Sequence, residues 1–572
     1  MSLFGSLQMA GNTLQAMQIG LHVVGNNIAN ANTPGYVREK AVFSPAPVQK
    51  LGNLTIGLGV EVTGIVQIID KFVESRLRDA GGDRASAEVQ ENVYRELEGV
   101  LASLQEKGSI TTLITDFFNA VNEVTNAPEN IAIRDLAIAA GGLLTQSIAT
   151  LEHRVAAKFQ DLDTRVTQVA DEINTLSEEI RQLNLRIVTL EGGGASGSEV
   201  GGLRSQRGVA LKKLAELADI TVNESDTGVT NVNINGEILI FEGTRREVVV
   251  DQADGDGRLA SQIRFADNGS PLEVSGGELQ GLYEARDTIL GGFLDGLDDF
   301  AQALTFEFNK VYSQGQGAVG FDTLTSTYRA VDPAAALNNA SLEFTPINGK
   351  FDLIIHNKNS KNTENNDTST ITIDLNGTDS ETTLISLAEA IDAVSGVSAV
   401  VSLDNELVIT SDSADIEFAF EKDTSGVLAA LGLNTFFTGS SAATLGVNQV
   451  LVTGESAGSR FAASLTGIGV GTDNAIDLIE LQDKGLEGID GSTILGVYDR
   501  LINETTQGAT ISASVAEGLR VFESTLDASA QAVTGVNLDE EAIDMIQLQR
   551  AYQASARYIR TLSELLDVLV NL

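Results

Sequence analysis

The apolar positions near both ends of the chain repeat every seven residues. The N-terminal set consists of Leu3, Leu7, Ala10, Leu14, Met17, Leu21, Val24 and Ile28. The C-terminal set consists of Leu538, Met545, Leu548, Tyr552, Ser555, Ile559, Leu562, Leu566 and Leu569. Steps that alternate between four and three residues predict helices with one apolar seam, as in coiled coils. Because neither helix can bury its seam alone, we predict that residues 1–36 and 536–572 pair as a terminal coiled-coil domain.

Longer apolar repeats predict that most of the chain between these ends is helical. Helices are expected over 70–107, 111–126, 129–191, 203–218, 278–313 and 492–533. From Phe159 to Leu190 the apolar steps alternate between three and four without an exception, which is typical of a helix packed along its length. Between 220 and 275 the pattern changes to strands, and Asn235-Gly236 predicts a hairpin turn. We predict a helical rod domain of residues 37–327 plus 456–535, with a β subdomain at 220–275.

A third pattern covers residues 328–455. This stretch is rich in Thr, Ser, Asn and Asp and contains alternating segments such as "STITIDLNG" and "IEFAFEKD". One amphipathic helix, "TLISLAEAIDAVSG", interrupts the strands. We predict a separate β-rich outer domain, inserted into the helical one. The fold class is therefore α+β multidomain.

The first helix is followed by an unusual stretch, "NNIANANTPGYVREK", at residues 26–40. Pro34 disfavours helix at Thr33, and Thr-Pro-Gly predicts a type II turn with Gly35 at the position of positive φ. Asparagines cap helix ends, yet a cap needs only one or two of the four present. No Lys, Arg, Asp or Glu precedes Arg38. The seam helix is therefore uncharged, and its end carries more amides than capping requires.

Composition excludes several classes of protein. The chain has 79 acidic and 37 basic residues and a formal charge of −42, so we expect no nucleic-acid partner. Cysteine is absent, which excludes disulfides and thiol chemistry. The three histidines lie far apart in sequence, at His22, His153 and His356. No cleaved signal peptide and no membrane insertion are expected, because the apolar residues are spaced rather than continuous.

Three short motifs resemble catalytic or binding loops, but each lacks its context. "GQGAVG" at 315–320 follows a predicted helix, whereas a dinucleotide loop follows a strand. "DQADGDG" at 251–257 lacks two ligand positions of a calcium loop and is interpreted as a hairpin tip. "GESAG" at 454–458 could follow a strand, but every histidine precedes Ser456, which is the wrong order for that triad. We expect no enzyme activity, no cofactor and no metal site.

The two ends together resemble the bacterial flagellar axial proteins, the family of rod, hook and hook-associated proteins. "NNIANANTPGY" is similar to their N-terminal signature, and "MIQLQRAYQASARYIRTLSELLDVLVNL" is similar to their C-terminal helix. "GVNLDEEAIDMIQLQRAYQASARYI" is most similar to the hook-associated branch. Segments "GLRSQRGVALKKLAEL" and "FEFNKVYSQGQGAVGFD" also resemble that branch, although Ser205 and Tyr312 replace its usual Asp and His.

The resemblance implies a structural protein of the hook–filament junction. Implied partners are further copies of the chain in a ring, the hook protein, a second junction protein, and a cytoplasmic export chaperone at the C-terminal helix. The protein would leave the cytoplasm through the flagellar type III apparatus and reside, secreted, in the flagellum. Residues expected at contacts between subunits are Asn26, Asn27, Asn30, Thr33, Gly35, Tyr36, Leu14, Leu21, Ile28, Leu548, Tyr552, Ile559, Leu562, Leu566 and Leu569.

Two alternatives remain open at this point. A hook or distal rod protein would share both terminal signatures. A protein of another class, a filament-borne adhesin or enzyme, would use residues 328–455 as its working domain.

Overall fold

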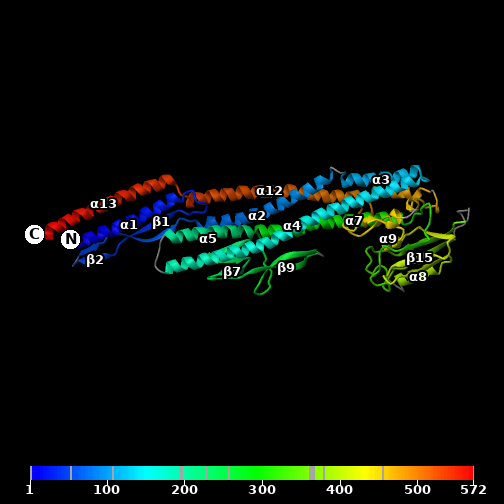
Figure 1. The fold of residues 1–572 in the computed structure, drawn as a ribbon, viewed down its shortest axis with the longest axis horizontal. Coiled ribbons are helices and arrows are strands. Elements are labelled where there is room, and N and C mark those ends of the chain that lie inside the picture. The colour runs from blue at the N-terminus through cyan, green and yellow to red at the C-terminus, as the bar shows by residue number, and fades with distance from the viewer. Residues whose placement is uncertain are drawn as a thin grey trace. The chain divides into compact units, whose positions relative to one another are not determined.

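The computed structural model divides into two compact units (Figure 1). The terminal unit comprises Met1–Val93, Gln160–Asp287 and Thr510–Leu572, and the central unit comprises Tyr94–Phe159 and Thr288–Ala509. Helices α2 (Lys71–Gln105), α4 (Ile131–Gly192) and α12 (Ile494–Thr534) contribute residues to both. The structure describes residues 3–51, 54–105, 108–192, 198–225, 228–255, 258–359, 367–377, 381–453, 457–469 and 471–570.

Two helices from opposite ends of the chain pair in the terminal unit. Helix α1 (Leu3–Ala29) lies beside α13 (Leu538–Val570), as predicted from their seams (Figure 1). Asn537 caps α13 by accepting a hydrogen bond from the backbone N–H of Asp539 at 3.0 Å. The carboxylate of Glu540, in the first turn of α13, accepts from Arg38 at 2.9 Å.

A small sheet follows α1 along the chain and packs against it. Strands β1 (Glu39–Pro45) and β4 (Val60–Gln67) pair antiparallel, and both contact α1. Strands β2 (Val48–Leu51) and β3 (Leu54–Gly57) form a hairpin between them. Residues 36–69 therefore return along α1 as extended chain, and Glu39 is placed at the first position of β1.

The rest of the terminal unit packs strands on α4 and α5 (Ser198–Leu217). The sheet runs in the order β5 (Ile220–Glu224), β6 (Thr230–Ile234), β7 (Glu237–Phe241), β8 (Thr244–Arg245), beside the hairpin of β9 (Val248–Gly255) and β10 (Arg258–Phe265). Asn235 and Gly236 have φ of 46° and 84°, which confirms the predicted hairpin turn between β6 and β7. Apolar residues of α4, including Val166, Val169 and Ile173, are fully buried in this core.

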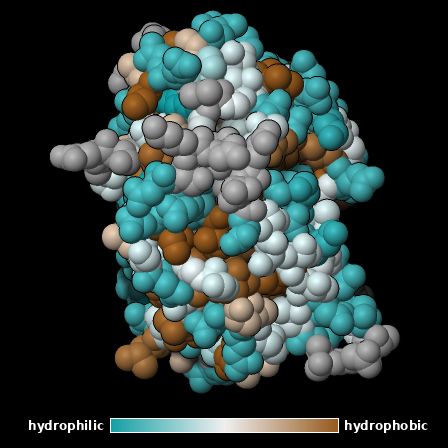
Figure 2. All heavy atoms as spheres, turned by 90° about the vertical axis from the view of Figure 1, so that its right-hand side faces the viewer, coloured by the Kyte–Doolittle hydropathy of each residue, from teal (hydrophilic) through white to brown (hydrophobic). Residues whose placement is uncertain are grey.

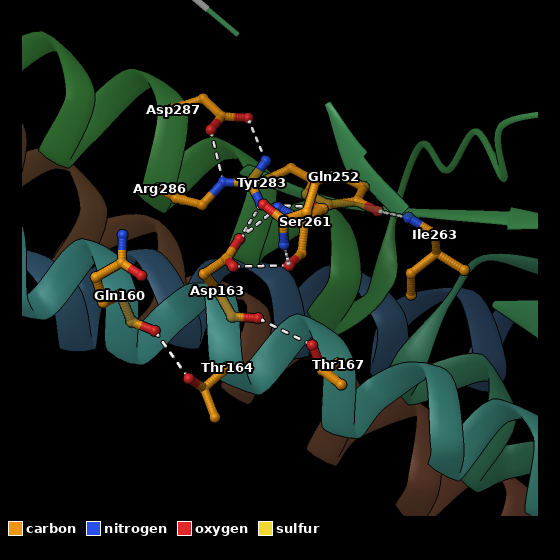
Figure 3. Close-up of polar contacts among 10 residues, drawn as sticks. All are labelled: Gln160, Asp163, Thr164, Thr167, Gln252, Ser261, Ile263, Tyr283, Arg286 and Asp287. Atoms are coloured by element: carbon orange, nitrogen blue, oxygen red, sulfur yellow. Dashed lines mark hydrogen bonds and ion pairs between the residues drawn. The ribbon is translucent and has the colours of Figure 1, made fainter. Parts of the chain in front are cut away.

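The predicted helix 278–313 is continuous but not uniformly α-helical. It consists of α6 (Gly277–Tyr283), a π-helix at Glu284–Gly291 and α7 (Gly292–Tyr312). The π-helix carries Arg286, which is 4% exposed and forms ion pairs with Asp163 and Asp287 (Figure 3). Arg286 also donates to the Ser261 carbonyl at 2.7 Å, and Asp163 accepts from the Ser261 hydroxyl at 2.7 Å. This network links α4, β10 and the π-helix, and nothing in the heptad pattern indicates it.

The central unit is built around a cluster of aromatic rings. Helix α3 (Ile110–Asn126) contributes Phe117, whose ring centre lies 5.3 Å from both Phe308 of α7 and Phe436. Gly141 of α4 provides the space for Phe436, since a Cβ there would lie 2.5 Å from that ring. Helix α4 runs uninterrupted through Gly141-Gly142, and Gly141 there meets a packing need.

The β-rich part of the central unit forms two three-stranded sheets over one core. One has the order β13 (Asp367–Ile373), β12 (Gly349–Asn357), β16 (Ile416–Glu421), and the other has β11 (Thr323–Thr325), β15 (Leu407–Ser411), β14 (Val397–Val401). The predicted inserted helix is α8 (Leu384–Asp392). The core continues through the short helix α9 (Val427–Leu431), and the unit also contains α11 (Asp473–Glu480).

The surface of this part mixes polar and apolar side chains. Figure 2 shows hydrophobic residues grouped among hydrophilic ones on the face that it presents. Large exposed apolar residues of this part include Val331, Ile347, Val400 and Leu403. The side-chain amide of Asn405 donates to the Val331 carbonyl at 3.4 Å, so the turn that carries Leu403 lies beside Val331.

The structure also locates the three short motifs. "GQGAVG" follows α7, as expected, and Gly317 packs against the backbone of Ser459. Strands β9 and β10 flank the predicted hairpin tip, but residues 256–257 lie outside the described part. The segment before "GESAG" is helix α10 (Gln449–Val452), not the strand considered from the sequence, and Ser456 itself lies outside the described part.

One described helix, α4, contains a window long and apolar enough to cross a membrane by length and composition. The sequence suggested no such window. Leu144, Ile148 and Leu151 of this helix are fully buried, whereas Ile131, Leu136 and Leu143 are exposed, and 39% of the window is buried inside the protein. The core helix of a protein can meet the same criterion, so one such window is weak evidence of a membrane span.

The terminal joint, a candidate assembly site

The turn after α1 has the predicted geometry. The backbone N–H of Tyr36 donates to the Thr33 carbonyl at 3.1 Å, and Gly35 between them has a φ of 75°. This is a type II turn with Pro34 and Gly35 at its centre. A Cβ on Gly35 would also overlap the side chain of Val209 in α5, so only glycine fits. The turn therefore ends α1 and seats the chain on α5.

Asn27 is the centre of the site, which we call the terminal joint (Asn26–Glu39 with Glu540 and Glu541). Its amide nitrogen donates to the Glu39 carbonyl at 2.9 Å and to the Glu541 carboxylate at 3.0 Å. Its amide oxygen accepts from the Glu39 N–H at 3.0 Å and from the Tyr36 hydroxyl at 2.9 Å. Asn27 is 1% exposed, and all four hydrogen-bonding positions of its amide are used within the chain. The sequence placed Asn27 at a contact between subunits, whereas the structure gives it an internal role.

The first charges of the chain meet the acids that open the last helix. Arg38 donates through Nε to Glu541 at 2.6 Å and through Nη1 to Glu540 at 2.9 Å. Glu541 is 1% exposed, and its other oxygen is held by Asn27. Burial lowers the pKa of the Arg38 guanidinium, but the two carboxylates raise it by more, so Arg38 stays charged.

The other amides stabilise the end of α1 locally. The side-chain amide of Asn30 donates to the carbonyl and to the amide oxygen of Asn26, each at 3.0 Å. The Thr33 hydroxyl donates to the amide oxygen of Asn30 at 3.3 Å and remains exposed. Burial raises the pKa of Tyr36, and the carboxylates of Glu39 and Glu541 raise it further. Tyr36 is therefore a neutral hydrogen-bond donor over the physiological pH range.

Glu39 is the third deeply buried polar residue of the joint, after Asn27 and Glu541. It is 2% exposed, and its side chain packs so closely on Gly201 of α5 that a Cβ there would overlap Oε1. Burial raises the pKa of its carboxyl to about 7, although the nearby amide of Asn26 offsets part of the effect. Glu39, Arg38, Glu540 and Glu541 were not among the residues predicted from the sequence. The order of charges along the chain could have indicated them, since the first base and the first acid follow an uncharged helix and three acids open α13.

The predicted seam of α13 is the side that meets α1. Leu562 is 5% exposed, and Leu548, Tyr552, Ile559 and Leu566 are half-buried. The side chain of Leu569 lies outside the described part. Gly20 of α1 allows the close approach, because a Cβ there would lie 3.1 Å from Leu548 and 3.0 Å from Phe43.

Helix α1 buries only part of the predicted seam fully. The fully buried residues are Ala10 and Val24 of the seam, together with Ala16, Gly20, Val23 and Asn27 outside it. Leu14, Leu21 and Ile28 are only half-buried in the single chain. The small residues face the close contacts with α13 and β1, because helices approach more closely where side chains are short. The larger leucines lie partly open.

We expect Asn27→Ala to destabilise the joint by about 2–4 kcal/mol. The change leaves the Tyr36 hydroxyl and both backbone groups of Glu39 without their hydrogen-bond partner, and it removes one hydrogen bond to the Glu541 carboxylate. Hydrogen exchange of residues 20–45 in the purified protein measures the effect. Asn32→Ala, at an exposed asparagine directly before the turn, is the matched control and should change exchange little. Equal exchange in both variants would contradict the central role of Asn27.

Comparisons with known proteins agree with these positions. Family models match at residues 7–36 (flagella basal body rod protein), 94–323 (flagellar hook-associated protein FlgK helical domain) and 529–572 (flagellar basal body rod FlgEFG protein C-terminal). The first and last of these matches cover most of α1, its turn and all of α13. Most of the joint described above, Asn26–Tyr36 with Glu540 and Glu541, therefore lies in the two segments that match the rod-protein models, and Arg38 and Glu39 follow the first of them.

Similar proteins extend over the whole chain. Flagellar hook-associated protein 1 of Escherichia coli (strain K12) is 24% identical over 577 residues, covering 98% of each chain. The protein of the same name from Bacillus subtilis (strain 168) is 23% identical over 582 residues, covering 100% of this chain and 98% of its own. A solved structure, the flagellar hook junction protein FlgK from Burkholderia pseudomallei, matches with a TM-score of 0.48 and 14% identity, over 80% of this chain and 100% of that one.

The terminal signatures, the helical-domain match and the full-length relatives agree, and the chain belongs to the flagellar hook-associated protein 1 family, structural proteins of the bacterial flagellum at the hook–filament junction.

Proposed function

We propose that this protein forms a ring of its own copies at the tip of the hook, on which a second junction protein and then the filament are built. Within the ring, the α1–α13 pair of each chain would contact the pairs of neighbouring copies. The observation that supports this is the apolar surface left open on α13. Among its described residues, Ile543, Ile546, Leu565 and Val568 are each at least half exposed, on a helix already paired along another side.

An exposed row of this kind is costly for a protein that acts as a monomer. The half-buried Leu14, Leu21 and Ile28 of α1 would be buried by the same neighbours, together with Thr33 and the open side of the turn. The hook protein and the second junction protein are the proposed partners at the two faces of the ring. Before export through the flagellar type III apparatus, a cytoplasmic chaperone would cover the apolar side of α13.

A complementation experiment tests the proposal. A strain that lacks the gene is expected to make hooks without filaments, as seen by electron microscopy, and the wild-type gene should restore filaments. The double variant Ile543→Ser/Ile546→Ser should fail to restore them, because it removes apolar area that only a neighbouring copy would bury.

The matched control changes two exposed polar residues on the same turns of α13. Gln547→Ser/Gln549→Ser should restore filaments, and both purified variants should show wild-type hydrogen exchange as monomers. A strain without hooks would instead favour a hook or rod protein. Normal filaments with Ile543→Ser/Ile546→Ser would refute the proposed contact between subunits.

A further inference from the structure

Glu39 is a buried acid. Within the described part of the chain, neither of its carboxylate oxygens makes a hydrogen bond of ordinary geometry, and the side-chain amide of Asn26 is the polar group that acts on it, although the residue is 98% buried. Its backbone, in contrast, is fully engaged by Asn27. An ionised carboxylate in such a position costs several kcal/mol unless it is paired, whereas a protonated one costs much less. The geometry therefore favours the neutral acid.

The groups around Glu39 do not supply a compensating positive charge. From α1 it meets the neutral amides of Asn26 and Asn27, and from the turn the neutral Tyr36. Arg38 is directed to Glu540 and Glu541 of α13. On α5, the contact is Gly201, and Arg204 of that helix acts electrostatically on Glu224. Among the described residues named here, the ionised groups are thus acids or cations that act on other acids.

Glu39 also lies at the place where three elements meet. It begins β1, its backbone is bound by the last turn of α1, and its side chain rests on the first turns of α5. A change in the charge of Glu39 would therefore change the stability of the packing of α1 and β1 on α5, and all three elements belong to the terminal unit.

We propose that Glu39 is a proton-operated latch of the terminal joint: protonated, it lets α1 and β1 pack on α5, and ionised, it loosens that packing. The proposal concerns the single chain and does not depend on the role in the hook–filament junction. Its ligand is the proton itself, and the moving part is the segment around the turn after α1.

The direction of the pH response follows from the pKa of Glu39, about 7 when packed and higher than its ordinary value of 4.5. The packed state binds the proton more tightly, so it is most stable below the ordinary value. Stability is lost as the pH rises from there through about 7, and the loss is complete above it. The equilibrium for opening the joint should increase on the order of a hundredfold over this range.

Hydrogen exchange of residues 20–45 at pH 5.5 and pH 8.5, in the full-length protein and in Glu39→Gln, tests the latch. Because both proteins have nearly the same peptide sequence, the ratio of their exchange rates removes the intrinsic effect of pH. The ratio of wild type to variant should rise at least tenfold from pH 5.5 to pH 8.5. Asp544→Asn, at an exposed acid of α13 outside the joint, should follow the wild type at both values.

A constant ratio for Glu39→Gln would overturn the proposal, and so would a pH response that persists in that variant. If Glu39→Gln does not fold, Glu39→Met replaces it in the experiment, since a methionine side chain has no hydrogen bonds to satisfy at the contact with Gly201. If neither variant folds, the wild type decides alone. Its protection at residues 20–45, corrected for intrinsic exchange rates, must fall by pH 8.5, and unchanged protection would exclude the latch.

Discussion

Leu562→Asp should release α13 from α1 and abolish filament assembly. Leu562 is 5% exposed and is the most buried apolar residue of the α13 seam in the described part. A carboxylate at that position would lose its hydration without gaining a cation, at a cost of more than about 3 kcal/mol. The paired helices are held mainly by this seam and by the joint at its end, so we expect a local loss of pairing rather than unfolding of the whole protein.

Two measurements check this result. Limited proteolysis of the purified variant should cleave within 538–570 while the rest of the chain stays resistant, and the variant gene should not restore filaments to a deletion strain. Ser563→Asp places the same charge one residue away, on the exposed side of α13, and should behave as the wild type in both assays. A protected α13 in the Leu562→Asp protein would show that the seam does not hold the helix.

Arg286→Met should be the most destabilising change outside the joint, by about 3–5 kcal/mol. The substitution keeps much of the side-chain volume but leaves the Asp163 carboxylate buried without its cation (Figure 3). It also removes the bond to the Ser261 carbonyl, which ties β10 to the π-helix. Hydrogen exchange of residues 248–265 should therefore increase more than exchange elsewhere in the terminal unit.

The control compares a buried ion pair with an exposed one in the same unit. Lys71→Met breaks a 3.1 Å pair with Glu224, but the lysine side chain is 79% exposed, so we expect a change below about 1 kcal/mol. Adding Asp163→Asn to Arg286→Met should recover part of the lost stability, because the unpaired charge is then gone. Similar losses of stability in Arg286→Met and Lys71→Met would contradict the larger cost assigned to breaking the buried ion pair.

Features set by local chemistry were predictable from the sequence. The seams of α4 and α13, the Asn235-Gly236 hairpin and the type II turn at Gly35 were all expected and are all present. Each depends on the spacing of apolar residues along one element or on the backbone preference of one or two residues. Such properties are contained in a short stretch of chain and need no knowledge of what lies beside it.

The partners of polar groups were decided only by the tertiary structure. Arg38 and Glu541 are 503 positions apart in the chain, and Asn27 and Glu541 are 514 apart, yet they form one buried group. The burial of Glu39 depends on Gly201, which no periodicity connects to it. The sequence by itself determined that each end of the chain forms a helix with an apolar seam. The N-terminal helix is uncharged, and the C-terminal helix opens with acidic residues. Close approach between elements that are distant in the chain decides which residues of α1 are buried. It also decides which asparagine is internal and which acid is removed from water, because burial and hydrogen bonding depend on neighbours in space.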